Sequence, residues 1–116
     1  MREIRFRAWD KKTEQYELLD SLFEFQKMNL AGYEYNERIF EQYTCFKDKN
    51  GVEIYEGDVI DGNLYDRKLP TRGQIVFDAH FSFYANKNEG GNTPIYRIAE
   101  IKIIGNIHEN PELLND

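Results

Sequence analysis

The sequence is poor in cysteine and histidine. Its 116 residues include one cysteine, Cys45, and two histidines, His80 and His108. A single cysteine excludes an intrachain disulfide and a cysteine zinc cluster. Two histidines are too few for a three-histidine metal site, and no closely spaced acidic partner completes a facial triad. We therefore expect no metal and no cofactor. The lack of disulfides suits a reducing cytoplasm.

Long apolar runs are also missing. No stretch of the chain approaches the roughly 20 apolar residues of a membrane-spanning helix. The charged start, Met1-Arg2-Glu3, is followed by alternating residues rather than by the apolar run of a signal peptide. The sequence thus predicts a soluble protein of the cytoplasm that has no membrane partner.

The chain has no excess of positive charge. It carries 15 basic and 21 acidic residues, for a formal charge of −6. Such a surface repels phosphate backbones, which disfavours nucleic-acid binding. The charge is uneven, however, because residues 1–12 hold five basic and two acidic side chains. This stretch is therefore +3, and the rest of the chain is −9.

Familiar catalytic patterns are absent as well. Gly90-Gly91-Asn92 lacks the lysine and the spacing of a phosphate-binding loop, and no serine lies in a nucleophile elbow. Cys45 has no histidine near it in sequence, so we expect a small side chain packed beside a strand rather than a reactive thiolate. The prediction is a protein that is not an enzyme and has no catalytic residues. A pair of carboxylates that meets only in space stays an open alternative.

What the chain does have is aromatic side chains and two-residue periodicity. Aromatic residues make up 15% of the chain, and they fit pleated sheets better than helix interiors. In the first segment Ile4, Phe6 and Ala8 alternate with Arg5, Arg7 and Trp9, which is typical of a strand. The length is that of one domain over residues 1–116. We predict an all-β or β-dominated fold, either a meander or a small partly open barrel, with one short helix and a C-terminal helical turn.

The remaining segments are assigned by pattern. Further strands are expected at 15–19, 38–44, 74–78, 81–85 and 95–107. Residues 61–73 are polar and predict a surface loop, and residues 86–94 predict a mobile connection. Leu22 and Phe23 favour a short helix within 20–37, although a loop there stays open. Asn110-Pro111-Glu112 predicts a helix start with Asn110 as the cap.

Two turns are marked by glycine. Asn50-Gly51 between apolar residues predicts a type I′ hairpin turn, in which both residues have positive φ. Gly57 marks a second turn. The acidic residues around these turns do not fit the calcium-loop spacing. We therefore expect the glycines to serve the backbone and the carboxylates to solvate the turns, with Tyr55 as a partly buried core or edge residue.

The basic first strand is the one candidate binding surface. Arg5 and Arg7 lie on the same face as Trp9, so the arginines could follow phosphates while the ring stacks on a base. The alternative is a solvent-facing strand whose arginines pair with carboxylates of this acidic protein.

Three segments together resemble one family. They are Ile4 to Asp10, Gln42 to Thr44 continued by Lys47 to Ile60, and Ile104 to Leu113. The chain resembles the YopX-like family of phage and prophage proteins, although that family usually has Gly-Leu where this chain has Cys45-Phe46. The resemblance implies a mostly β fold and a phage or prophage setting in bacteria. It implies no established activity and supplies no catalytic residue.

Together these observations favour a noncatalytic phage or prophage accessory protein that binds an unidentified protein partner, either phage or host. An exposed aromatic strand edge could add a partner strand or a second copy of the chain. The alternative is a nucleic-acid-binding module that uses Arg5, Arg7 and Trp9.

Overall fold

The computed structural model describes residues 5–19, 38–64, 70–77, 83–86 and 92–114. In these residues it is β-dominated, which confirms the predicted fold class, and the only helical elements are short 3₁₀ turns. None of the helices described is long and apolar enough to cross a membrane. The elements are β1 (Phe6–Asp10), β2 (Gln15–Leu19), β3 (Arg38–Lys47), β4 (Glu53–Tyr55), β5 (Asp58–Leu64), β6 (Pro70–Phe77), β7 (Phe83–Asn86), β8 (Asn92–Pro94), η2 (Ile95–Arg97), β9 (Ile98–Asn106) and η3 (Pro111–Leu114).

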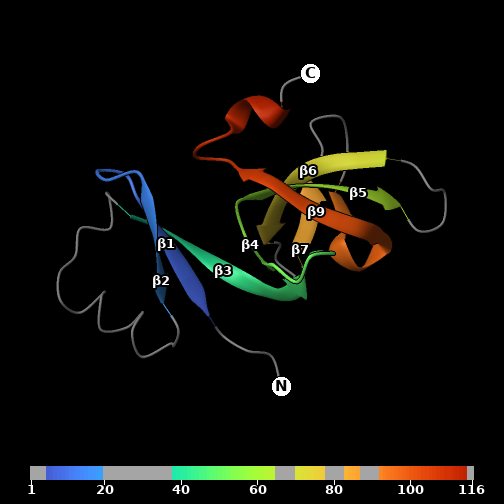
Figure 1. The fold of residues 1–116 in the computed structure, drawn as a ribbon, viewed down its shortest axis with the longest axis horizontal. Coiled ribbons are helices and arrows are strands. Elements are labelled where there is room, and N and C mark those ends of the chain that lie inside the picture. The colour runs from blue at the N-terminus through green and yellow to red at the C-terminus, as the bar shows by residue number, and fades with distance from the viewer. Residues whose placement is uncertain (1–4, 20–37, 65–69, 78–82, 87–91, 115–116) are drawn as a thin grey trace.

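The strands form two antiparallel sheets that lie side by side (Figure 1). The smaller sheet has the order β2-β1-β3-β4, so the first strand is central and β2 lies at an edge. The larger sheet has the order β8-β7-β6-β5-β9 and curls into a half-barrel. The chain passes from one sheet to the other at the tight turn between β4 and β5. Any residue near this turn can therefore touch both sheets.

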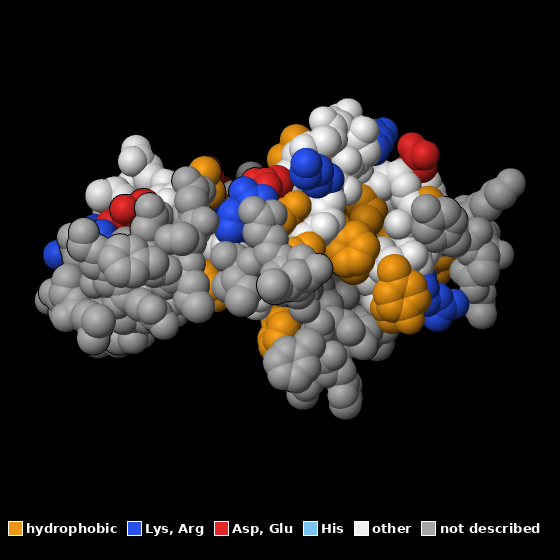
Figure 2. Space-filling model, turned by 90° about the horizontal axis from the view of Figure 1, so that it is seen from below, with side chains coloured by type: hydrophobic (Ala, Val, Ile, Leu, Met, Phe, Trp, Pro, Cys, Tyr) orange, Lys and Arg blue, Asp and Glu red, His pale blue; other side chains and the backbone are white. Residues whose placement is uncertain are grey.

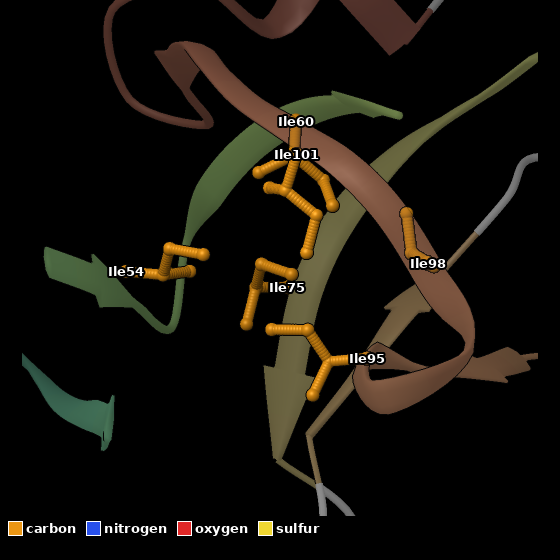
Figure 3. Packing of buried hydrophobic residues seen from close by; sticks show 6 residues of the cluster. All are labelled: Ile54, Ile60, Ile75, Ile95, Ile98 and Ile101. Atoms are coloured by element: carbon orange, nitrogen blue, oxygen red, sulfur yellow. The ribbon is translucent and has the colours of Figure 1, made fainter. Parts of the chain in front are cut away.

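The main hydrophobic core fills the half-barrel (Figure 3). It consists of six isoleucines, with Leu64 and Ile103 packed against them: Ile54, Ile60, Ile75, Ile95, Ile98 and Ile101. Burial of each such side chain contributes about 1.5–3 kcal/mol. Ile54 belongs to β4 of the smaller sheet, yet it points into this core. The core of the half-barrel thus also holds part of the smaller sheet.

The hairpin turn after β3 is present, but the type I′ prediction is wrong. Gly51 has a φ of 83°, whereas Asn50 is not among the residues with positive φ. The Asp48 carbonyl accepts the Gly51 N–H at 2.9 Å, and the Val52 carbonyl accepts the Asp48 N–H at 2.8 Å. This pattern is that of a three-residue loop with a glycine bulge. The Asp48 side chain decides the outcome, since its carboxylate accepts N–H groups inside the turn.

Two predicted connections are partly strands. Residues 61–64 and 70–73 are not a surface loop, because they belong to β5 and β6. The polar side chains of these residues do not show the apolar alternation that marks a strand. Arg72 is exposed and pairs with Asp61 across the strands, while Thr71 is buried between exposed neighbours. In the predicted connection 86–94, Asn86 ends β7 and Asn92–Pro94 forms β8. Residues 87–91 lie outside the described residues, as does the helix predicted within 20–37.

The C-terminal part also differs in detail. The strand predicted over 95–107 begins with the 3₁₀ helix η2, so β9 starts only at Ile98. The final helical turn is confirmed as η3, and Asn110 precedes it at the predicted cap position, where its carbonyl accepts the Leu113 N–H at 3.1 Å. Its Oδ1 accepts the N–H of Asn106 at 3.3 Å, and a Cβ on Gly105 would lie 2.5 Å from the same oxygen. Asn110 therefore folds the last turn back against β9.

Candidate functional site

A buried cluster of charges connects the two sheets, and Arg7 is at its centre. Arg7 lies on the central strand β1 and is only 9% exposed. Its Nε donates to Glu41 Oε1 at 2.8 Å, and its Nη2 donates to Asp58 Oδ1 at 2.8 Å. Nη2 also donates to the backbone carbonyl of Glu56 at 3.1 Å. Because Glu41 is on β3 and Asp58 is on β5, one guanidinium bonds to both sheets.

The second oxygen of Glu41 extends the cluster to the C-terminal segment. Glu41 Oε2 lies 3.0 Å from Nε2 of His108, a residue that follows β9. The His108 ring stacks on the Trp9 ring, with centroids 4.7 Å apart and an interplanar angle of 6°. Arg7, Glu41, Asp58 and His108 thus form what we call the inter-sheet joint.

Tyrosine rings surround the guanidinium of the joint. The Arg7 Cζ lies 4.0 Å from the ring centroid of Tyr16 on β2 and 5.0 Å from that of Tyr55 on β4. Both distances are within the range of a cation–π contact. Tyr16 also makes an edge contact with Trp9, at 4.9 Å between centroids. The rings keep water away from the charges, which strengthens each ion pair and raises the cost of losing a partner.

The missing side chain of Gly57 leaves room for the carboxylate of Glu41. This residue has a φ of 86°, and a Cβ built on it would lie 2.1 Å from Glu41 Oε2. Its N–H donates to the Ile75 carbonyl at 2.9 Å, and its own carbonyl accepts the Ile107 N–H at 2.9 Å. The predicted backbone role of Gly57 is therefore confirmed, and close packing adds a second requirement.

Burial and neighbouring charges together shift the pKa values of the groups at the joint. It lowers the pKa of the Arg7 guanidinium, but Asp58 and Glu41 outweigh it, so the net pKa is raised. Burial raises the pKa of Asp58 above its usual value although Arg7 and the Tyr55 N–H favour its ionised form. Burial also raises the pKa of the Tyr16 phenol, which keeps it protonated. One guanidinium that bonds to carboxylates from two different sheets is suited to holding these sheets together.

The three predicted nucleic-acid-binding residues lie in contacts within the protein. Arg7 and Trp9 are buried, so the expectation of a solvent-facing strand is wrong for both. Arg5 pairs with Glu53, and its Cζ lies 4.5 Å from the Tyr43 ring centroid. The predicted pairing of Arg5 and Arg7 with carboxylates is confirmed. Trp9 stacks on a histidine rather than on an open surface.

The acidic residues of the two turns have separate partners. Asp48 accepts backbone N–H groups, Glu53 pairs with Arg5, and Asp58 pairs with Arg7. Glu56 Oε1 accepts the Gln42 N–H at 3.0 Å, and burial raises its pKa. Across the described parts of the chain, no three His, Cys, Asp or Glu side chains lie in a group that could hold a metal ion. The predicted position of Tyr55 is confirmed, since it is 5% exposed.

Sequence reasoning missed Glu41 and the role of His108. The two residues are 67 positions apart, and no spacing rule connects them. The available signal was Arg7 itself, a charge between the apolar residues Phe6 and Ala8. His80 lies outside the described residues.

The tip of the β3–β4 hairpin is the second notable feature. Phe46 is 41% exposed and Val52 is 51% exposed. Lys47 and Lys49 lie between them and are also exposed. Cys45, expected to pack beside a strand, is exposed and has a φ of 70°, so that prediction is wrong. Hydrophobic side chains are visible at the surface of the half of the molecule that holds the larger sheet (Figure 2).

These features define a β-dominated domain of two antiparallel sheets connected by a buried ionic joint. The family described as YopX protein matches residues 7–115, so the chain belongs to the YopX family. Among solved structures, protein EF1440 from Enterococcus faecalis is similar, with 25% sequence identity and a TM-score of 0.58. That match covers 97% of this chain and 98% of the other. No curated protein matches the chain.

Proposed function

We propose that this YopX-family domain is a noncatalytic phage or prophage accessory protein that binds a protein partner in the bacterial cytoplasm. The observation that carries the proposal is the contrast between its two notable features. The charged groups at the joint are buried and bonded to one another, whereas Phe46 and Val52 at the hairpin tip face solvent. Exposed apolar side chains on a pre-formed turn are suited to partner binding.

The nucleic-acid alternative has less support. Arg7 is committed to two carboxylates, and Trp9 is 6% exposed, so neither is available to a phosphate or a base without breaking the joint. The net charge of −6 also opposes binding to a phosphate backbone. An enzyme that uses a pair of carboxylates also has less support. The two carboxylates of the joint, Glu41 and Asp58, are both paired with Arg7.

The test is affinity capture of the tagged protein from its native bacterial host, followed by mass spectrometry with and without nuclease. A specific protein that is recovered after nuclease treatment supports the proposal. Recovery of nucleic acid, with loss of every protein on nuclease treatment, would favour the alternative. Recovery of no specific partner from lysogenic or infected cells would count against both.

A further inference from the structure

The hairpin tip combines hydrophobic and basic side chains on an acidic protein. We propose that Phe46, Lys47, Lys49 and Val52, the hairpin tip surface, bind an acidic protein segment that carries hydrophobic side chains. This inference rests on the proposed function and names the surface and the chemistry of the partner. All four residues are exposed.

The charge of this surface is opposite to that of the whole chain. Lys47 and Lys49 are exposed, while the chain as a whole carries −6. The tip also holds the buried carboxylate of Asp48, which accepts backbone N–H groups and interacts electrostatically with Lys49. This carboxylate offsets one of the two lysine charges and leaves a balance of 2 − 1 = +1, while Glu53 pairs with Arg5. The lysines thus present a local positive field, which an acidic partner segment would complement.

The tip is held rigidly before any partner arrives. Asp48 Oδ1 accepts the N–H groups of Asn50 at 2.8 Å and Val52 at 2.9 Å. Its other oxygen accepts the Ile103 N–H at 3.3 Å, and the Lys49 N–H donates to the Ile101 carbonyl at 2.8 Å. These bonds fix the turn against β9. Binding to a rigid surface costs less conformational entropy, so a small surface can give measurable affinity.

The two exposed apolar side chains, Phe46 and Val52, favour a protein over a nucleic acid as the partner. Phe46 could stack on a base, but Val52 has no ring to do so, and both can contact aliphatic side chains. Two lysines neutralise few phosphates, and the rest of the acidic chain repels a nucleic-acid backbone. An acidic segment with hydrophobic residues satisfies both the charge and the apolar area of the tip.

The experiment is an NMR titration of the ¹⁵N-labelled protein with a short synthetic peptide in which glutamates alternate with leucines. The expected result is that amide signals of residues 46–52 shift, and that a matched peptide with lysine in place of glutamate leaves them unchanged. The double variant K47E/K49E should weaken binding about tenfold or more. The matched control K11E/K12E makes the same charge change on the exposed β1–β2 turn and should bind like wild type.

Four results would overturn the inference. They are unchanged signals at the tip, equal binding of the lysine peptide, stronger binding of a single-stranded oligonucleotide at the same residues, and concentration-dependent broadening of the tip signals without peptide, which would indicate self-association. Failure here is distinguishable from failure of the proposed function. If K47E/K49E captures the same nuclease-resistant partner as wild type, the domain binds protein but through another surface.

Discussion

Replacing Gly57 with alanine tests the packing at the inter-sheet joint. The new Cβ would lie 2.1 Å from Glu41 Oε2 and 2.6 Å from Glu41 Cδ. A carboxylate at the end of a flexible side chain could usually move away. Glu41 is different, since its side chain is 4% exposed and both oxygens have partners, Arg7 at 2.8 Å and His108 at 3.0 Å. The side chain can therefore yield only by losing these bonds.

The magnitude follows from two contributions. A positive φ of 86° costs an alanine about 1–2 kcal/mol relative to glycine. Displacement of Glu41 breaks a buried ion pair, which typically costs about 3–5 kcal/mol. The total loss in the free energy of unfolding is thus roughly 4–7 kcal/mol, a large part of the ~5–15 kcal/mol of an ordinary domain.

Gly51 supplies the matched control. Its φ of 83° is nearly the same, but a Cβ there meets nothing within 4 Å. G51A should therefore lose only about 1–2 kcal/mol. Equilibrium urea denaturation of wild type, G51A and G57A measures both losses. Equal losses for the two variants would refute the reasoning, because the cost would then come from backbone strain alone. If G57A is unfolded in buffer while G51A melts cooperatively, the reasoning is supported.

Three further predictions concern stability. R7M should lower the free energy of unfolding by about 3–5 kcal/mol in urea titrations, because the carboxylates of the joint lose their cation. R72M removes an exposed ion pair and should cost about 1 kcal/mol or less. Equal costs for the two variants would argue against the joint. Burial acts to raise the pKa of Asp48, but its backbone N–H donors outweigh burial and the net pKa is lowered. Its stabilisation is therefore present above the unfolded pKa of about 3.9 and is lost as pH falls through the lower folded value. D48N should be less stable than wild type at pH ~7, and the difference should shrink below pH ~4; a constant difference across this range would contradict the assignment. Deletion of residues 104–116 should unfold the domain, since it removes the end of β9 and the joint histidine; a cooperative thermal transition in the truncated protein would show otherwise.

Local signals in the sequence predicted the parts of the fold that depend on local chemistry. Alternation around Ala8 predicted β1, and both glycine turns were placed correctly. The turn type at Asn50-Gly51 was not, because the Asp48 carboxylate competes with the backbone preference of the dipeptide. When a side chain accepts N–H groups of its own turn, the turn type depends on geometry that residue identity alone does not supply.

Long-range pairing was beyond prediction. Arg7 has a favourable interior position only because Glu41 and Asp58 meet it from two sheets, at separations of 34 and 51 residues. Without those partners, a charge on a strand is expected to face water, so the sequence alone predicts a solvent-facing strand. For the same reason, the polar residues 61–64 and 70–73 predict a loop although they form strands. The Arg72–Asp61 pair stabilises this pairing of strands, and hydrophobicity gives no sign of it.

We propose that this domain binds a protein through its hairpin tip, and that the buried charges of the joint hold the two sheets together. The most direct test is quantitative capture from the native host, after nuclease treatment, with wild type, K47E/K49E and K11E/K12E as baits. We expect one specific protein that is retained by wild type and K11E/K12E and lost with K47E/K49E. A partner lost equally from both variants, or nucleic acid as the only material recovered without nuclease, would contradict it.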